Sequence, residues 1–205
     1  MTKKITKKST KHKILTKRGY ILDKNLITSD ELKKIKEQLT AIPQLGNDYG
    51  DTVESFPLYI ENKSSICIPR YYGTFNYGDP IKTIGLKGKK TKLKFKGKLR
   101  DNQLPIVKTA IKTLKESGGG ILQLYCGCGK TVMALNIAAT LKAKTLIIVH
   151  KTFLLNQWHD RIKQFTNAKV GIIRRNIVDI EGKDIVVGML QSISMIDYDL
   201  SIFND

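Results

Sequence analysis

Apolar residues are spaced in two different ways along this chain, and the change divides it into two regions. Between residues 19 and 95 the apolar runs are short and mixed. A helix is predicted after a capping box at 28–31, and the alternating runs 56–60 and 65–69 predict a β-hairpin. Residues 92–96 alternate strictly, which predicts a strand with lysines on one face. This region therefore predicts a small α+β domain.

From residue 96 onwards, longer apolar runs alternate between helical and strand spacing. Residues 99–116 have a helical period, and three consecutive glycines at 118–120 end that helix. The elements predicted after it are strand 121–124, helix 130–141, strand 145–149, helix 153–165 and strands 170–173 and 184–187. Alternating strands and helices are typical of a parallel sheet with helices on its faces. We therefore expect an α/β fold for residues 96–205.

Positive charge is concentrated in two short stretches of a chain whose formal net charge is +18. Residues 1–18 hold eight lysines and arginines, residues 82–100 hold nine, and neither stretch contains an acidic residue. Because the first stretch has almost no apolar residues, we expect a disordered basic tail over 1–18. Charge clustered in this way favours a nucleic-acid partner. A solvated tail and a solvated strand face are the alternative interpretation.

The composition also excludes several classes of protein. No run of about 18 apolar residues occurs, so we expect no membrane partner. The lysine-rich N-terminus is not followed by the apolar segment of a secretory signal. The three cysteines, Cys67, Cys126 and Cys128, have neither the even number of a disulfide framework nor the spacing of a zinc site. They indicate reduced thiols in an intracellular compartment.

A phosphate loop is predicted at residues 124–131, which read Leu-Tyr-Cys-Gly-Cys-Gly-Lys-Thr. The segment follows a predicted strand and opens a predicted helix, which is the context that such a loop requires. Its glycines allow successive backbone N–H groups to point at one anion, aided by the helix N-terminus. The residues expected to bind ATP here are Cys126, Gly127, Cys128, Gly129, Lys130 and Thr131. Lys130 would act on the β- and γ-phosphates as the catalytic cation, and the Thr131 hydroxyl would bind Mg²⁺.

The loop and the segment before it resemble those of superfamily 2 helicases, in particular the XPB-type branch and related helicases of large DNA viruses. In that branch a leucine commonly opens the loop, as Leu124 does here in place of the usual glycine. Leu-Arg-Asp-Asn-Gln at 99–103 resembles the motif that precedes the loop. The resemblance implies that Gln103 reads the edge of adenine, with Arg100 beside it in the nucleotide site.

Two later segments resemble family motifs that contact a nucleic-acid strand. Residues 146–158 resemble motif Ia, and 184–193 resemble the strand and turn of the next motif. The resemblance implies that the strand backbone is contacted by Lys151, Thr152, Gln191 and Ser192, with Thr152 as a helix N-cap.

Residues 20–98 also resemble the N-terminal region of the viral helicases, although no residue role follows from this. The aromatic residues there are compatible with stacking on unpaired bases, with clamping a duplex backbone or with packing in a core. For Tyr71, Tyr72 and Phe75 individually, core packing is the preferred interpretation.

The resemblance implies an ATP-dependent helicase or translocase that acts on DNA or RNA, seen here as its ATP-binding N-terminal portion. It also implies a viral origin, with the host cytoplasm or the virion as location. The 205 residues contain no Asp-Glu-x-His or Asp-Glu-x-Asp box. The RecA-like sheet is therefore expected to be incomplete, with a second RecA-like domain in a longer chain or on a partner.

Such a second domain carries the arginine fingers that stabilise phosphoryl transfer. The full-length protein is expected to hydrolyse ATP, whereas these residues alone are expected to bind ATP without efficient hydrolysis. The alternative function is a non-catalytic, nucleotide-sensing module that binds nucleic acid.

Overall fold

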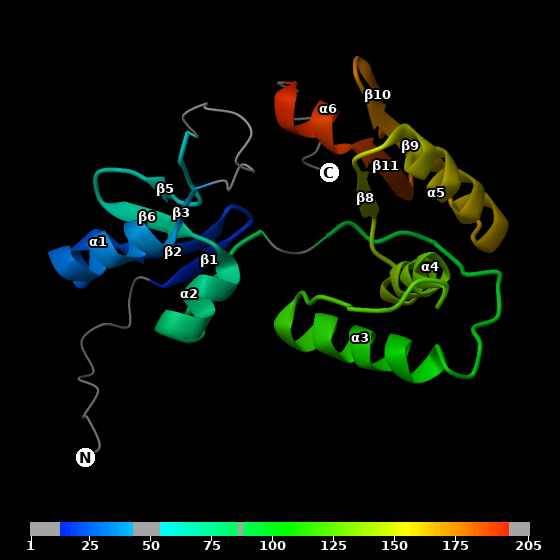
Figure 1. The fold of residues 1–205 in the computed structure, drawn as a ribbon. Helices are drawn as coiled ribbons and strands as arrows, with labels where there is room; N and C mark the ends of the chain where they lie inside the picture. Colours follow the sequence, from blue (N-terminus) through cyan, green and yellow to red (C-terminus); the bar gives the residue numbers. More distant parts are fainter. Residues whose placement is uncertain (1–12, 43–53, 86–87, 197–205) are drawn as a thin grey trace. The chain divides into compact units, whose positions relative to one another are not determined.

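The computed structural model describes residues 13–42, 54–85 and 88–196, drawn in colour in Figure 1. The chain forms two compact units, Met1–Lys87 and Gly88–Asp205. Unit 2 begins a few residues before the expected boundary at residue 96, because residues 88–95 pack with it. Leu93 is buried in the core of unit 2, and Phe95 forms an isolated β-bridge with Thr166.

Unit 1 contains a five-stranded sheet of order β5-β6-β2-β1-β7 and a separate strand pair, β3-β4. Its strands are β1 (Ile14–Thr16), β2 (Gly19–Asp23), β3 (Thr40–Ala41), β4 (Phe56–Pro57), β5 (Ile60–Glu61), β6 (Ser65–Ile68) and β7 (Lys82–Thr83). Its helices are the 3-10 helix η1 (Lys24–Leu26), α1 (Ser29–Gln38) and α2 (Arg70–Tyr77). The N-cap of the predicted capping box is confirmed, since Thr28 precedes α1 and its hydroxyl accepts a hydrogen bond from the Glu31 N–H at 3.2 Å.

Two expectations for unit 1 were wrong. The stretch 1–18 is not wholly a disordered tail, because Ile14–Thr16 pairs antiparallel with β2 and Leu15 is buried. Residues 1–12 lie outside the described part of the chain. The expected hairpin is shorter than predicted, since only Ile60–Glu61 pairs with β6, whereas Phe56–Pro57 pairs with β3. In both cases pairing and burial outweighed local composition.

The core of unit 1 forms where α1 and α2 pack on the sheet. Its buried members are Leu15, Tyr20, Leu22, Ile35, Leu39, Ile66 and Ile68. The Tyr20 ring is fully buried, and its hydroxyl donates to the Gly78 carbonyl at 3.1 Å. Gly73 brings α2 against this ring, since a Cβ at that position would lie 2.3 Å from Tyr20 Cγ. One face of α2 is therefore fixed against Tyr20.

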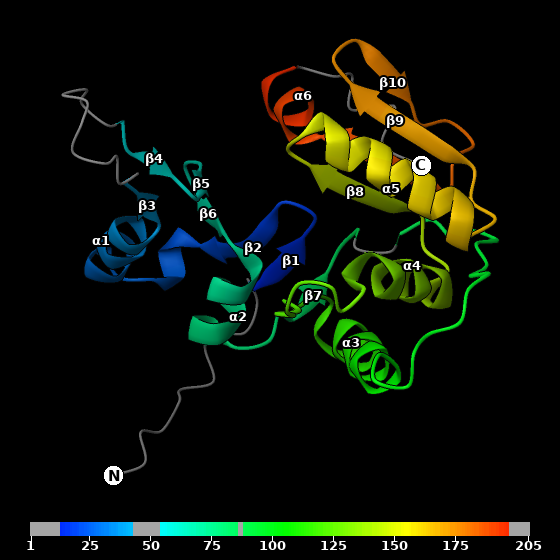
Figure 2. The ribbon, with the colours of Figure 1, turned by 45° about the vertical axis from the view of Figure 1, so that its right-hand side comes forward.

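Unit 2 contains a four-stranded sheet of order β10-β9-β11-β8, in which β9, β11 and β8 are parallel and β10 is antiparallel. Its strands are β8 (Thr145–Val149), β9 (Val170–Arg174), β10 (Ile177–Asp179) and β11 (Ile185–Met189). Its helices are α3 (Leu104–Ser117), α4 (Lys130–Leu141), α5 (Thr152–Phe165) and α6 (Leu190–Met195). The expected α/β fold with parallel strands and flanking helices is confirmed. Figure 2 shows α5 lying along the sheet.

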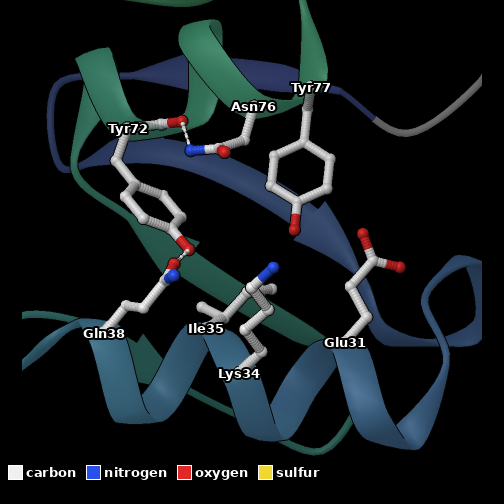
Figure 3. A pocket seen from close by; sticks show the side chains of 7 residues that line it. All are labelled: Glu31, Lys34, Ile35, Gln38, Tyr72, Asn76 and Tyr77. Atoms are coloured by element: carbon white, nitrogen blue, oxygen red, sulfur yellow. Dashed lines mark hydrogen bonds between the residues drawn. The ribbon is translucent and has the colours of Figure 1, made fainter.

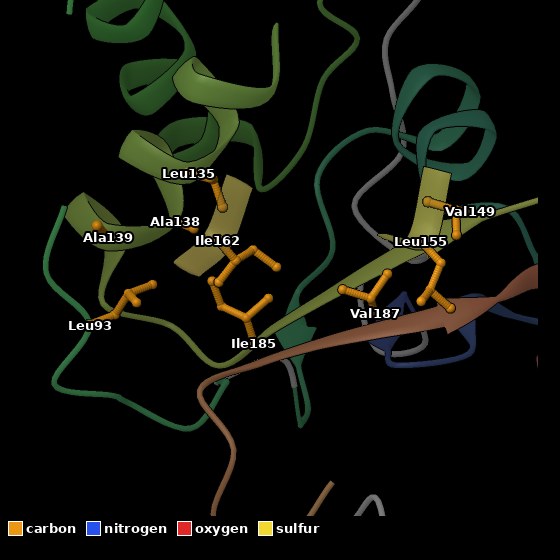
Figure 4. Packing of buried hydrophobic residues seen from close by; sticks show 9 residues of the cluster. All are labelled: Leu93, Leu135, Ala138, Ala139, Val149, Leu155, Ile162, Ile185 and Val187. Atoms are coloured by element: carbon orange, nitrogen blue, oxygen red, sulfur yellow. The ribbon is translucent and has the colours of Figure 1, made fainter. Parts of the chain in front are cut away.

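The main core of unit 2 joins α4 and α5 to β8 and β11 (Figure 4). It contains Leu93, Leu135, Ala138, Ala139, Val149, Leu155, Ile162, Ile185 and Val187. A second cluster packs α3 against α4 and includes Leu99, Val107, Ala110, Cys128, Met133 and Ile137. Through these two clusters, α4 connects the sheet to α3. No helix in the described segments is long and apolar enough to span a membrane.

Several predicted elements of unit 2 differ from those observed. Residues 121–124 and 92–96 are not strands, and α3 begins at Leu104 rather than near residue 99. The segment 92–96 nevertheless keeps its alternation, because Leu93 is buried while the lysines on either side of it are exposed. Neither segment forms a continuous set of β-sheet hydrogen bonds with a described strand. Because a strand is defined by this pairing, an alternating or apolar sequence alone does not make one. The short β10 and α6 were not predicted.

Candidate nucleotide and strand site

The phosphate loop is an irregular segment that leads directly into α4. Gly127 and Gly129 have φ angles of +80° and +85°, in the left-handed region that favours glycine. Gly129 is also the N-cap of α4, so the first N–H groups of this helix open onto the loop. A Cβ added at Gly127 would have no atom within 4 Å, which leaves open space beside the loop backbone. An anion can approach the backbone there.

Lys130 folds back over the loop that precedes it. Its ammonium donates to the carbonyl oxygens of Leu124 at 3.1 Å and Tyr125 at 2.9 Å. The side chain is exposed, so a phosphate can replace these carbonyls without unfolding the loop. Thr131, in the first turn of α4, is half-buried.

Gln103 lies beneath the loop and is 3% exposed. Its amide nitrogen donates to the Cys128 carbonyl at 2.8 Å, and its amide oxygen accepts from the Arg100 N–H at 3.0 Å. It also limits the space at Gly129, where a Cβ would lie 2.4 Å from Gln103 Nε2. The structure therefore joins residues 99–103 to the phosphate loop through the hydrogen bonds of Gln103 and through the packing of Leu99 with Cys128, while the Arg100 side chain is exposed.

The segments expected to contact nucleic acid meet at one edge of the parallel sheet. Val149, at the end of β8, pairs with Met189, at the end of β11. The two chains continue into Lys151 and Gln191, and the Gln191 amide donates to the His150 carbonyl at 2.9 Å. Lys151, Thr152 and Gln191 are all exposed. Sheet register and this hydrogen bond thus bring the two motifs together.

Two details of this edge differ from expectation. Lys151, with φ −134° and ψ 143°, is the N-cap of α5, and the structure shows no side-chain cap hydrogen bond there. Thr152 is the first helical residue, so its expected capping role was wrong, because the extended conformation of a cap lies one residue earlier. Ser192 is 6% exposed, and its hydroxyl accepts from the Arg175 N–H at 2.7 Å. Its oxygen therefore faces the β9–β10 turn.

That turn adds two cations that the sequence analysis missed. Ile173 pairs with Gly188, so Arg174 ends β9 in the same row as Met189 and Val149. Arg175 follows with a φ of +52°. The polar residues Arg-Arg-Asn at 174–176, between two apolar runs, could have predicted this turn. The strand after it, β10, has only three residues, which is too few to show an alternating pattern. We call residues 150–152, 174–176 and 190–192 together the carboxyl edge.

The cysteines form no metal site among the described residues. Cys67, Cys126 and Cys128 are free thiols, and within the segments that the structure describes no cluster of three or more His, Cys, Asp or Glu side chains occurs. Cys128 is buried with the α3–α4 cluster, whereas Cys126 is exposed at the loop. The two loop cysteines therefore differ in environment.

Residues 96–203 match the protein family described as "Type III restriction enzyme, res subunit". The chain belongs to this family. The match covers the phosphate loop and the carboxyl edge, and together with the relatives it confirms the resemblance to superfamily 2 helicases.

Three relatives of this chain are named as helicases or as a translocase. It is 43% identical over 197 residues to "Putative ATP-dependent RNA helicase L396" of Acanthamoeba polyphaga mimivirus, covering 93% of this chain and 38% of that protein. It is 34% identical over 160 residues to "Putative helicase 109L" of Invertebrate iridescent virus 3, covering 71% and 47%. It is 40% identical over 81 residues to "DNA 3'-5' translocase XPB2" of Sulfurisphaera tokodaii, covering 40% and 18%. The chain spans less than half the length of each of these relatives.

Proposed function

We propose that this chain is the ATP-binding portion of an ATP-dependent nucleic-acid helicase or translocase. The observation that carries the proposal is the phosphate loop, in which two glycines in the left-handed region lead into α4 and Lys130 lies over the loop carbonyls. Family membership and the names of the relatives support it. DNA or RNA is the proposed polymer.

The loop geometry fits the triphosphate of ATP. Its backbone N–H groups and the start of α4 would hold phosphate oxygens, and Lys130 would exchange the Leu124 and Tyr125 carbonyls for the β- and γ-phosphates. The Thr131 hydroxyl would hold Mg²⁺. When bound, ATP supplies the transferable phosphoryl group and Mg²⁺ neutralises its charge.

Gln103 has a role in shaping this site. Since its amide is bonded to the Cys128 carbonyl, the side chain holds the floor of the phosphate loop. A carboxamide has a second N–H and a second lone pair, so contact with adenine is compatible with these two bonds. We propose that Gln103 positions the loop and that Arg100 completes the nucleotide site.

The carboxyl edge would hold the nucleic-acid strand. Lys151 presents a cation and Thr152 the N-terminus of α5, both suited to a phosphate. Gln191 would contact the strand while linked to the His150 carbonyl, so the two motifs act as one surface. The buried Ser192 hydroxyl would act through the Arg175 turn, which it holds at this edge.

In the complete protein, ATP-driven closure of this unit on a second RecA-like domain would move the strand along the edge. We further propose that residues 1–205 alone bind ATP but hydrolyse it slowly. This rests on the acidic box and the arginine fingers that the family resemblance implies, since residues 1–205 contain no Asp-Glu-x-His or Asp-Glu-x-Asp box.

The deciding experiment measures ATP binding and ATP turnover, with and without single-stranded DNA or RNA. It compares this chain with a chain extended to the length of its relatives. Each is tested with Lys130→Ala and, as a matched control, Lys115→Ala on the exposed side of α3.

The helicase proposal expects nucleic-acid-stimulated hydrolysis by the extended chain that Lys130→Ala abolishes and Lys115→Ala preserves. If the extended chain binds ATP and nucleic acid but does not hydrolyse ATP, the helicase proposal is wrong and the nucleotide-sensing module is the better account. If Lys130→Ala binds ATP as well as the parent does, residues 124–131 are not the ATP-binding loop.

A further inference from the structure

Helix α2 in unit 1 exposes two large aromatic side chains. Tyr71 is 52% exposed and Phe75 is 89% exposed. They are four residues apart, so they lie on one face of the helix. Core packing was expected for both and is wrong, because Gly73 and Tyr77 hold the opposite side of α2 against the core. Two exposed aromatic rings on one helix face form an apolar patch, and such patches often mark interaction sites.

Basic groups stand at both ends of α2, and one of them, Arg70, lies beside the aromatic face. The Arg70 guanidinium, at the start of α2, lies 5.5 Å from the centroid of the Tyr71 ring. At the end of α2 the Lys13 ammonium donates to the Tyr77 carbonyl. The chain reaches Lys13 from a stretch whose sequence contains five further lysines and no acidic residue. Asp79 is the acidic residue that follows α2.

The neighbouring side of α2 is already occupied by internal contacts. Tyr72 and Asn76 line a groove of about 170 Å³ against α1, shown in Figure 3. The Tyr72 hydroxyl donates to the Gln38 side-chain oxygen at 2.6 Å, and the Asn76 amide donates to the Tyr72 carbonyl at 2.9 Å. The Tyr72–Gln38 bond joins α2 to α1, whereas the Asn76–Tyr72 bond lies within α2. Tyr71 and Phe75 are thus presented by a helix that is anchored on its other sides.

We propose that this face of α2 binds unpaired nucleic acid, with bases stacked on Tyr71 and Phe75. Arg70, which lies over the Tyr71 ring, would neutralise an adjoining phosphate. Exposed aromatic rings beside a cation suit a single strand, since every base has a face for stacking and every nucleotide carries a charge. The proposal concerns unit 1 and does not depend on the phosphate loop.

The test uses the full chain and measures fluorescence anisotropy with a labelled oligothymidylate and a duplex of the same length. The variants are Tyr71→Ala, Phe75→Ala and Phe75→Tyr, with Tyr72→Phe as a control on the groove side. We expect each alanine variant to weaken single-strand binding by about 5- to 150-fold. Phe75→Tyr and Tyr72→Phe should retain binding. The salt dependence should stay as in the parent, because no cation is removed.

Thermal unfolding distinguishes a lost contact with nucleic acid from a lost fold. Because Phe75 is exposed, Phe75→Ala should leave the midpoint of thermal unfolding unchanged. Equal loss of single-strand and duplex binding, or unchanged single-strand binding, would overturn the proposal. A change in oligomeric state without a change in strand binding would instead assign the face to a protein contact. Lys130→Ala should retain this binding and Phe75→Ala should retain ATP binding, so the two proposals can fail separately.

Discussion

The phosphate loop and the exposed face of α2 are binding surfaces built in opposite ways. The loop relies on backbone atoms, which two glycines and the buried Gln103 hold in one shape. The α2 face relies on the side chains of a regular helix whose backbone would be the same with other residues. A loop of the first kind tolerates few substitutions, whereas a face of the second kind should lose affinity gradually, one side chain at a time.

The largest effect that sharpens this comparison is expected for Gly129→Ala. The substitution places a Cβ at a φ of +85° and 2.4 Å from Gln103 Nε2. Because Gln103 is buried and hydrogen-bonded, the free energy of unfolding should fall by about 2–4 kcal/mol. ATP affinity should fall with it. Chemical denaturation and nucleotide titration measure the two changes.

Gly127→Ala is the matched control for that change. Its φ is +80°, but a Cβ there meets no atom within 4 Å. Only backbone strain remains, so we expect a loss of about 1–2 kcal/mol. Equal losses for the two variants would show that the Gln103 contact does not constrain the loop.

The next effect is expected for Gln103→Leu. This change leaves the Cys128 carbonyl and the Arg100 N–H without their partner, which should cost about 1–3 kcal/mol of stability. Gln103→Glu keeps an acceptor for Arg100 but cannot donate from a carboxylate. Both variants should therefore weaken ATP binding. If Gln103→Glu binds ATP as the parent does, the bond to Cys128 is not what shapes the loop.

Graded effects are expected at the carboxyl edge, which resembles the α2 face in using side chains. Lys151→Ala removes one cation, so the slope of log K against log salt should become shallower by about 0.7–0.9. Gln191→Ala removes an uncharged group and should lower affinity with the slope unchanged. Binding measured from low to high salt distinguishes them, and identical slopes in both variants would exclude a phosphate contact by Lys151.

The smallest effect concerns the support of the α2 face. Burial, and then the Glu31 carboxylate nearby, raise the pKa of the Tyr77 hydroxyl well above its usual 10.0. The folded state then holds the proton more tightly than the unfolded state. Its contribution to stability is complete below about pH 10 and is lost as the pH rises further. Tyr77→Phe should flatten this part of the stability profile, and an unchanged profile would argue against the shift.

The elements that the sequence predicted well are those specified by local chemistry. The cap at Thr28, the helix α4 after the loop glycines, and the pattern of β8 and α5 each depend on residues close in sequence. The candidate site residues were proposed in the same way, because a phosphate loop needs particular residue types at particular positions. The segment 121–124 was wrongly predicted as a strand. Its apolar run favours an extended conformation, but the sequence does not show which strand it would pair with.

The sequence by itself determined the phosphate loop, the succession of α3, α4, β8, α5, β9 and β11 in unit 2 and the concentration of positive charge. It also contained Gln103 and Gln191, but not what they bind. Tertiary structure decided that Gln103 lies under the loop, that the Arg174–Arg175 turn joins the carboxyl edge, and that Tyr71 and Phe75 face outward. The reason is physical: backbone geometry and capping act over a few residues, whereas burial and sheet register depend on segments far apart in the chain.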